Sequence, residues 1–283
     1  MKVLILGSSG QVGAYLTEYL RKENIEVIEF DKENSINQDL TKIPNSLLIE
    51  SIKKADFIFF LAFDVGGSRY LKKYQDTFDF INNNTRLMVN TFENIKKFNK
   101  KFIFASSQMS NMNFSPYGLL KKLGELYTES LNGLIVKFWN VYGIENDIEK
   151  AHVITDFIRK GFEDSSFKML TNGLEERDFL YAEDCCNALK VIMDNYDKFS
   201  SKDPLHITSF KFTKILEIAK IIENLFKEID KEIHIIPAKE EDSIQKLHRN
   251  LPDEFILNYW QPKTLVNEGI RKVFNEMKKN YEK

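Results

Sequence analysis

Two short stretches of the sequence hold residues whose types and spacing could act on an alcohol carbon. In "SPYGLLKKLGE", Tyr117 and Lys121 are four residues apart, so a helix that begins at Pro116 would present both on one face. An ammonium beside a phenol favours the phenolate, which would lower the pKa of Tyr117 toward neutrality, as proton exchange with a carbinol requires. Ser107 ends the apolar run "KFIFASS", where its hydroxyl could bond the same substrate oxygen. The pattern predicts one catalytic group of Ser107, Tyr117 and Lys121.

A glycine-rich turn near the N-terminus could hold a dinucleotide. The first apolar run leads into "GSSGQVG", which places Gly7, Gly10 and Gly13 in a turn and the first turn of a helix. Glycine there allows a tight turn, close approach of the backbone to a pyrophosphate, and close packing of helix on strand. The second run ends at Asp31, whose carboxylate can accept both hydroxyls of an adenosine ribose and would repel a 2′-phosphate. The pattern therefore predicts NAD in preference to NADP.

Two further positions fit the same cofactor. Asp39, in "NQDLTK", suits a contact to the adenine edge, although an exposed helix-cap aspartate is the alternative. Ala62, in "FLAF" at the end of a strand, would let the backbone approach the cofactor, although a small packing residue fits equally. Because the Tyr117–Lys121 pair follows these elements and a strand, it is interpreted as functional rather than as an exposed helical pair.

The chemistry needs a sheet whose strands all end at one edge. Short apolar runs alternate with amphipathic segments through the first half of the chain, which is typical of strand-helix units and of a parallel sheet covered on both faces. The runs are residues 3–6, 27–30, 57–62, 102–105 and 134–138. The second half mixes helices with short strands and is interpreted as a smaller lobe; the helices are expected at about 154–162 and 213–226, and the strands at 205–208 and 233–237.

The predicted fold class is α/β, a Rossmann-type doubly wound parallel sheet with a smaller C-terminal α/β substrate lobe. Residues 1–145 are predicted to form the dinucleotide-binding domain, to which the chain returns around 174–200. Residues 146–283 are predicted to be mainly the substrate-binding lobe.

Charge and composition argue against several partners. The 283-residue chain has a formal charge of -2, so it has no general attraction to nucleic acid or to an anionic membrane. Its first apolar run is far shorter than a signal-peptide core or a membrane span. The adjacent Cys185 and Cys186 cannot form an ordinary disulfide framework and are interpreted as packing residues, so a reducing cytoplasm is expected. No Cys/His cluster has metal-ligand spacing, and no metal is predicted.

Together these motifs resemble those of the extended short-chain dehydrogenase/reductases, in the group of NAD-dependent nucleotide-sugar epimerases and dehydratases. The similarity covers nearly the whole chain and rests on "GSSGQVG", Asp31, "FLAF", Ser107, "YGLLK", "WNVYG", "RDFLYAED" and "YWQPKTLVNEGI". Members of this family oxidise or reduce a sugar carbon, most often C4, with a bound nicotinamide. The resemblance implies that Ser107 orients the sugar hydroxyl, Tyr117 exchanges its proton, and Lys121 holds the nicotinamide ribose.

The resemblance also implies roles outside the catalytic group. Asn84 falls on an asparagine that supports the active site and the cofactor. Arg177, in "RDFLYAED", matches the arginine that grips the diphosphate of the substrate, with a structural ion pair as the alternative. Arg249 is a second candidate for the same diphosphate, and Asn140, in "WNVYG", is assigned to substrate binding. The expected substrate is a nucleotide-diphosphate sugar.

Departures from the family pattern bear on the reaction. Dehydratases of the family have an acidic pair directly after the catalytic serine or threonine, where this chain has Gln108 and Met109, which cannot shuttle a proton. Two stretches, "LAFDVGGS" and "AHVITDFIRKGF", look like GDP-fucose synthase, in which a histidine placed like His152 and a cysteine placed like Met109 move protons. His152 is therefore a candidate acid or base, with a residue at a helix start as the alternative.

Three functions stay open on these residues. Asp31 favours an NAD-dependent 4-epimerase, which needs no net redox partner, over an NAD(P)H-dependent 4-ketoreductase of the GDP-fucose synthase kind. A catalytically silent nucleotide-binding scaffold is the third. Nine residues separate Ser107 from Tyr117, fewer than in relatives. The sugar pocket is therefore expected to be more open, or to be completed by "DVGGSRY" or by a second subunit.

A homodimer is expected from the helix that begins at Pro116. It carries two apolar lines, one of Leu119, Leu123 and Leu126 and the other of Leu120, Tyr127 and Leu131. One line can cover the sheet and leave the other for a partner, although a single wide core-facing stripe would give the same pattern. The resemblance implies pairing of this helix with the one near 84–98.

Overall fold

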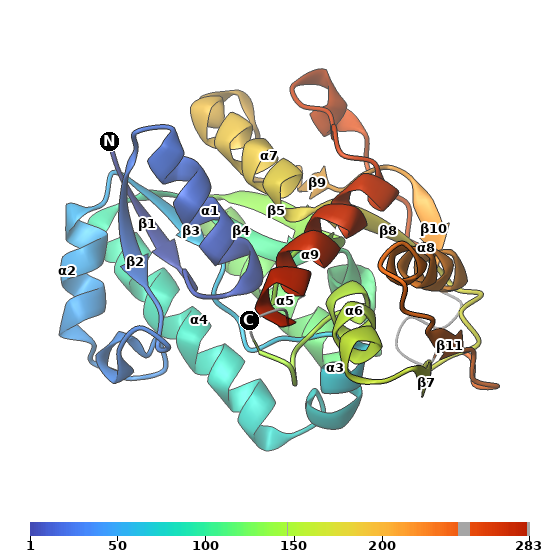
Figure 1. The fold of residues 1–283 in the computed structure, drawn as a ribbon. Helices are drawn as coiled ribbons and strands as arrows, with labels where there is room; N and C mark the ends of the chain where they lie inside the picture. Colours follow the sequence, from blue (N-terminus) through green and yellow to red (C-terminus); the bar gives the residue numbers. More distant parts are fainter. Residues whose placement is uncertain (146, 243–249, 282–283) are drawn as a thin grey trace.

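The computed structural model describes residues 1–145, 147–242 and 250–281 of the chain. Within these residues, six strands form one parallel sheet in the order β2-β1-β3-β4-β5-β9 (Figure 1). The strands are β1 (Lys2–Leu6), β2 (Glu26–Phe30), β3 (Phe57–Phe60), β4 (Lys101–Ser107), β5 (Leu134–Phe138) and β9 (Leu205–Ile207). Because the strands are parallel, their carboxyl ends share one edge of the sheet, which is where ligands bind in such folds.

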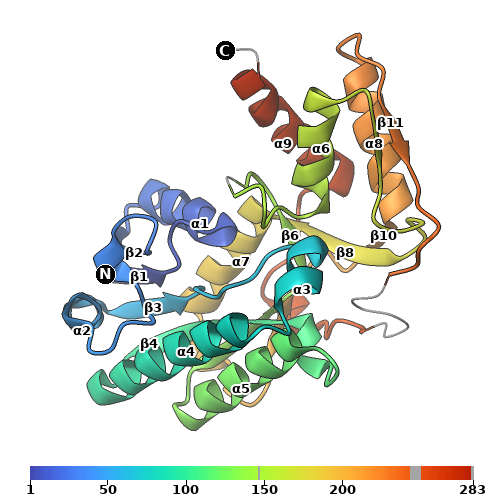
Figure 2. The same ribbon diagram turned by 90° about the horizontal axis from the view of Figure 1, so that it is seen from below.

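Helices cover both faces of this sheet (Figures 1 and 2). On one face lie α1 (Gln11–Lys22) and α7 (Ala182–Asp194), and on the other lie α2 (Ser46–Lys54), α4 (Phe78–Phe98) and α5 (Pro116–Ser130). A short helix, α3 (Ser68–Tyr74), follows β3. Single 3₁₀ turns are η1 (Ile36–Gln38), η2 (Gln108–Asn111), η3 (Tyr196–Lys198) and η4 (Phe255–Asn258).

The strands are almost continuously hydrophobic because both of their faces are buried. In β1, Val3 and Ile5 pack into the layer of α1 and α7, whereas Leu4 and Leu6 pack into the layer of α2, α4 and α5. The helix α5 comes close to β4 at Gly124, where a Cβ atom would lie 2.3 Å from the Phe104 ring. This close packing fixes the helix that carries Tyr117 and Lys121 against the strand that ends at Ser107.

The smaller C-terminal lobe has two further sheets and three helices in the described part of the chain. One sheet has the order β10-β8-β6, and in the other β11 pairs with β7. The elements are β6 (Asn140–Tyr142), α6 (Val153–Glu163), β7 (Ser166–Lys168), β8 (Glu176–Tyr181), β10 (Phe212–Lys214), α8 (Ile215–Lys227), β11 (His234–Ile236) and α9 (Val266–Tyr281). Their apolar side chains form a separate core cluster. The predicted α/β class, with a Rossmann-type sheet and a smaller lobe, is confirmed.

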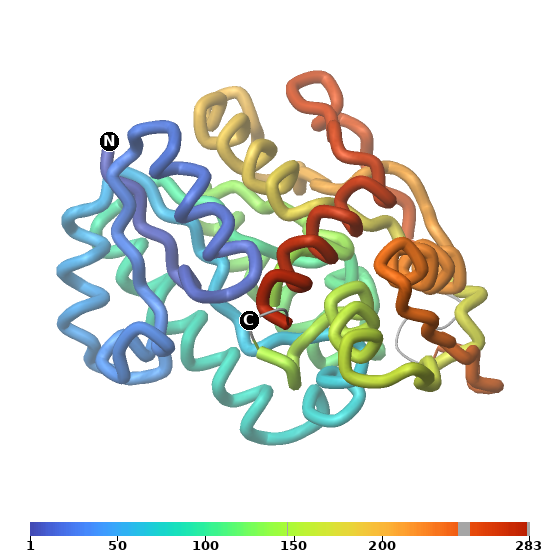
Figure 3. Tube along the Cα trace, in the orientation of Figure 1, coloured from blue at the N-terminus to red at the C-terminus, as the bar shows by residue number. Residues whose placement is uncertain are grey.

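One predicted element lies in a different place. The strand expected at 205–208 in the smaller lobe is β9, the edge strand of the main sheet beside β5. The chain reaches it after α7, which packs against α1 (Figure 3). A strand of three residues carries too little pattern to identify its neighbour, so its assignment to the lobe was wrong. The proposed domain boundaries stay a prediction. None of the helices in the described residues has the length and apolar character needed to cross a membrane.

Candidate active site

Ser107, Tyr117 and Lys121 come together at the carboxyl end of β4. Ser115 caps the start of α5 by accepting a hydrogen bond from the Gly118 amide at 3.2 Å, and Pro116 occupies the first turn. The Ser107 hydroxyl hydrogen-bonds the Tyr117 phenol and also accepts from the Met109 amide at 3.2 Å. All three side chains of the predicted group are buried. The structure therefore places them together, while their catalytic roles stay a prediction.

The ionisation of the pair differs from the prediction. Burial raises the pKa of Tyr117 to about 12, although its hydrogen bond with Ser107 acts in the opposite direction. Burial also lowers the pKa of Lys121 to about 7, against the opposing charge of Glu125. The expected lowering of the Tyr117 pKa by Lys121 is therefore wrong for this structure. The reason is that a buried site disfavours both charged forms.

The surroundings of Lys121 explain why its pKa is lowered. Its Nζ donates a hydrogen bond to the Ala105 carbonyl at 2.7 Å and lies 3.8 Å from the centroid of the Phe63 ring. The centroid of the Tyr117 ring is 5.9 Å away. A carbonyl and a ring face stabilise an ammonium group less than a carboxylate does. Phe63 was not predicted as part of the site; its position directly after Ala62 was the available signal.

The glycine turn follows β1, whose carboxyl end lies at the same edge of the sheet as that of β4, with β3 between them. Gly7 has φ +89°, and a Cβ atom on it would lie 2.7 Å from the Cα atom of Ala62. A Cβ atom on Gly13 would lie 2.0 Å from the Gly7 carbonyl oxygen. The Gly10 amide bonds the same oxygen at 3.2 Å. Only glycine satisfies the first two positions, so α1 begins close against the end of β1.

Asp31 lies beside this turn at the end of β2. Its Oδ2 accepts a hydrogen bond from the Ser9 amide at 3.0 Å, and its Oδ1 accepts from the Glu33 amide at 3.0 Å. A carboxylate held next to a glycine turn and the start of a helix fits an adenosine ribose joined to a pyrophosphate. The residues present therefore fit a dinucleotide.

Asp39 and Asn84 have different surroundings. Asp39 accepts hydrogen bonds from the amide and the hydroxyl of Thr41, at 2.9 and 2.7 Å, so it caps a local turn. Its contact to adenine stays a prediction. Asn84 is fully buried in α4, accepts from the Asp64 amide at 2.8 Å, and donates to the Asp64 and Phe80 carbonyls. It therefore supports the segment that follows β3 and Ala62.

Two of the predicted substrate-binding residues, Arg177 and Asn140, lie on strands of the smaller lobe. Arg177, on β8, forms an ion pair with Asp242 and donates to the Glu176 carbonyl at 2.8 Å. Asn140, on β6, donates to the Asp178 carbonyl at 3.1 Å. Arg249 lies outside the described residues. The ion pair of Arg177 matches the structural alternative, and the role of each residue toward a diphosphate stays a prediction.

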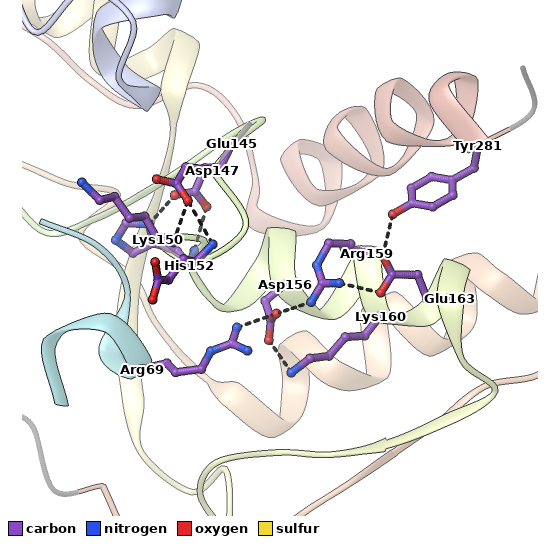
Figure 4. Close-up of polar contacts among 11 residues, drawn as sticks. Arg69, Glu145, Asp147, Lys150, His152, Asp156, Arg159, Lys160, Glu163 and Tyr281 are labelled. Carbon is purple, nitrogen blue, oxygen red and sulfur yellow. Dashed lines mark hydrogen bonds and ion pairs between the residues drawn. The ribbon is translucent and has the colours of Figure 1, made fainter. Parts of the chain in front are cut away.

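His152 has a partner that the sequence analysis missed. Its Nδ1 lies 2.6 Å from one oxygen of Glu145, and its amide donates to the other oxygen at 2.8 Å (Figure 4). Burial disfavours the imidazolium, but the adjacent carboxylate outweighs it and raises the pKa of His152 above its ordinary value. The available signal was a carboxylate in the same loop. With Nδ1 bound to Glu145, Nε2 is the nitrogen that remains for another partner.

The segment "DVGGSRY" packs against the loop that holds His152. Lys150 forms an ion pair with Asp64 at 2.9 Å. Arg69 forms one with Asp156 at 2.6 Å (Figure 4). Gly67 is so close that a Cβ atom would lie 2.7 Å from the Ala151 carbonyl. These contacts join the segment after β3 to the start of α6.

The C-terminal part of the chain contacts the connection after Ser107, and a cavity lies away from the catalytic group. Asn250 donates a hydrogen bond to the Gln108 carbonyl at 2.7 Å, so the C-terminal part of the chain reaches the short connection after Ser107. A cavity of about 570 Å³ lies elsewhere, lined by residues 209–213, 257 and 261–267. None of the predicted site residues lines this cavity, so its size gives it no part in the chemistry above.

A glycine turn with a neighbouring carboxylate, followed by a Ser, Tyr and Lys group at the same sheet edge, defines a dinucleotide-dependent short-chain dehydrogenase/reductase. Residues 3–207 match the family described as the NAD dependent epimerase/dehydratase family. The chain belongs to this family, as its motifs indicate.

Relatives of the chain include different enzymes. It is 26% identical to a protein named putative UDP-glucose 4-epimerase from Methanocaldococcus jannaschii, over 98% of this chain and 99% of that protein. It is 25% identical to a GDP-L-fucose synthase from Sinorhizobium fredii, over 99% and 96%. An epimerase structure from Methanothermobacter thermautotrophicus has a TM-score of 0.85 at 20% identity, over 99% of this chain and 93% of that one. At this identity the last comparison shows the fold alone.

The burial of Lys121 makes the stability of the protein without added cofactor depend on pH. The native pKa of Lys121 is about 7, below its ordinary value, so between pH 7 and pH 9 the unfolded state binds more protons than the native state. Wild-type stability should therefore rise with pH relative to Lys121→Met, by about 1 kcal/mol per pH unit. Urea unfolding of both proteins at pH 7, 8 and 9 measures the difference. If the free energies of unfolding of the two proteins change with pH in the same way, the lowered pKa of Lys121 is contradicted.

Proposed function

We propose that the protein is an NAD-dependent nucleotide-sugar epimerase that acts by transient oxidation at sugar C4. The observation that supports this most is the buried group of Ser107, Tyr117 and Lys121 at the same sheet edge as the glycine turn and Asp31. Membership of the NAD dependent epimerase/dehydratase family agrees with this proposal.

The protein residues divide the work between binding and proton exchange. The cofactor would be held by the glycine turn, Asp31 and Lys121, with Asp39, Ala62 and Asn84 around it, and when bound it supplies the acceptor and donor of hydride. Ser107 would hydrogen-bond the C4 oxygen and orient it toward Tyr117. Tyr117, as its phenolate, would take the hydroxyl proton as C4 is oxidised and return it as C4 is reduced, so this step requires that binding of the cofactor and the sugar lowers the Tyr117 pKa that burial raises. The burial of all three groups keeps competing water away from this oxygen.

A 4-ketoreductase is the second candidate, and one observation favours it. The Glu145–His152 pair provides a histidine with a raised pKa, a candidate acid, next to the segment that follows β3. Similarity to a GDP-L-fucose synthase points the same way. Asp31 and the buried Met109 favour the epimerase instead, because a thioether cannot move a proton.

The cofactor balance separates these functions. The purified protein is incubated with a panel of UDP- and GDP-sugars, 4-keto forms included, while NADH absorbance and product stereochemistry are followed. An epimerase changes the sugar without a net change in NADH, whereas a reductase consumes NADH stoichiometrically. In either case Tyr117→Phe should lower kcat by about a hundredfold or more, since it removes the exchangeable proton. Wild-type turnover in this variant would exclude both functions.

The choice of NAD can be tested at Asp31. Replacing it by alanine removes a charged acceptor for two ribose hydroxyls and the repulsion of a 2′-phosphate. Asp31→Ala should weaken NAD binding by about tenfold to a hundredfold. The difference between the affinities for NAD and for NADP should therefore become smaller. Titration calorimetry with both cofactors measures this. Glu33→Gln, a change at an exposed carboxylate two residues on, is the control and should leave both affinities unchanged. Equal NAD affinity in Asp31→Ala and wild type would reject the assignment.

We also propose a homodimer that forms through α4 and α5. Leu120 faces the core and Leu123 packs against it, whereas Leu119 and Leu126 are 51% and 52% exposed, so these two leucines of α5 remain for a partner. Phe114 precedes this helix, and Phe78 and Ile81 at the start of α4 are also exposed. Neighbouring exposed apolar residues on adjacent helices are typical of an interface.

A charge in this surface should dissociate the dimer. Leu126→Glu would bury an unpaired carboxylate on association, so light scattering after size exclusion should give the mass of a monomer. Leu47→Glu, at a 45% exposed leucine on α2, is the matched control and should leave the dimer intact. A monomeric wild type, or a dimeric Leu126→Glu variant, would reject this interface.

A further inference from the structure

A second buried charge lies on the helix that carries Tyr117 and Lys121. Glu125 follows Lys121 by one turn of α5, and its side chain is 0% exposed. Burying an ionised carboxylate is costly unless hydrogen bonds and opposite charges surround it. The proposed reaction does not use Glu125, so the fold must keep this charge for another reason.

Three side chains, one each from β4, β5 and α5, surround this carboxylate. The Ser106 hydroxyl at the end of β4 donates to Oε1 at 2.6 Å, and Lys137 Nζ on β5 lies 3.4 Å from the same oxygen. Lys122 Nζ lies 3.0 Å from Oε2. Burial opposes ionisation, but the Ser106 hydroxyl and the charge of Lys137 act against it, and the pKa of Glu125 lies below its ordinary value. Glu125 is therefore charged at neutral pH.

The same cluster holds the short connection between Ser107 and Tyr117. Ser106 directly precedes Ser107, and Lys137 Nζ donates a hydrogen bond to Asn111 Oδ1 at 3.0 Å, at the end of η2. Glu125 thus reaches the connection at its start, through Ser106, and at its middle, through Lys137. A shift of this cluster would move the backbone that carries Ser107.

Glu125 also acts on Lys121 by charge. Lys121 is buried against the Ala105 carbonyl and the Phe63 ring, and Glu125 is the charged group that opposes the loss of its proton. The titratable groups around these two residues are Tyr117, Lys122, Lys137 and, beside Lys137, His206 on β9.

We propose that Glu125 is a positioning residue, which fixes the backbone at Ser107 and supplies the negative charge that balances Lys121. The proposal rests on the proposed function, because Ser107 and Lys121 matter here as members of the catalytic group. Glu125 does not touch the reacting atoms in this arrangement; it acts through Ser106, Lys137 and Lys121.

The test is Glu125→Gln, which keeps the shape and a hydrogen-bond acceptor for Ser106 but removes the charge. The titration of Lys121 is followed by NMR at its Cε atom, identified as the lysine signal that is missing from Lys121→Met. In Glu125→Gln this titration should move to lower pH. The variant should also lose about tenfold or more in kcat, and the alkaline limb of its kcat profile should move to lower pH.

A matched control lies one turn further along α5. Glu129→Gln changes a partly exposed carboxylate on the same helix and should leave the Lys121 titration and kcat as in wild type. If Glu125→Gln does not fold, as judged by circular dichroism, the double variant Glu125→Gln/Lys137→Gln removes both buried charges. Its Lys121 titration should still lie below that of wild type.

Two outcomes would overturn the proposal. One is a folded Glu125→Gln protein, or a folded double variant, in which Lys121 titrates as in wild type. The other is a lower kcat that only follows a smaller folded fraction, without any shift of the pH profile. Failure of the proposed function can be distinguished from failure of this proposal. A wild-type protein that turns over no nucleotide sugar still gives the Lys121 titration, on which the role of Glu125 is tested.

Discussion

The desolvation of Lys121 is the physical constraint that sets the ionisation of the buried group at the carboxyl edge of the sheet. To reach this edge between α5 and β4, its ammonium group leaves water for the Ala105 carbonyl and the Phe63 ring. Neither partner carries a full charge, so a larger fraction of Lys121 is the neutral amine near neutral pH. The same burial disfavours the phenolate of Tyr117. Tyr117 thus rests in its neutral form, and Lys121, with a pKa of about 7, is the group of the pair whose protonation a small change in local charge can alter.

Much of the fold could be predicted because its signals are local. Apolar runs of about strand length, the spacing of Gly7, Gly10 and Gly13, and the four-residue spacing of Tyr117 and Lys121 each lie within one element or one turn. These signals predicted β1 to β5 of the main sheet, its glycine turn and the helix α5. Their common place at one sheet edge follows from the parallel order of the strands.

The features of the fold and of the candidate site that could not be predicted depend on contacts between segments that are distant in the sequence. β9 is a three-residue strand whose partner β5 lies far upstream, and Lys137 meets Glu125 only because β5 pairs with β4. The ionisation of Tyr117 was predicted wrongly for a related reason. Helical spacing shows that Lys121 shares a face with Tyr117, but not that Phe63 and β4 bury both groups. Burial, rather than spacing, decides the direction of such pKa shifts.

In the proposed reaction, the groups that can move a proton limit the number of sugar carbons that would change. Epimerisation at C4 needs one proton exchange at one oxygen, which Tyr117 can provide with Ser107 as its hydrogen-bond partner. Inversion beside a keto group needs an acid and a base on opposite faces of a carbon. Met109 can be neither, and the imidazole of His152 is held through Nδ1 by Glu145, which leaves one nitrogen for exchange. The side chains of this site therefore suit chemistry at a single carbon better than successive inversions at two.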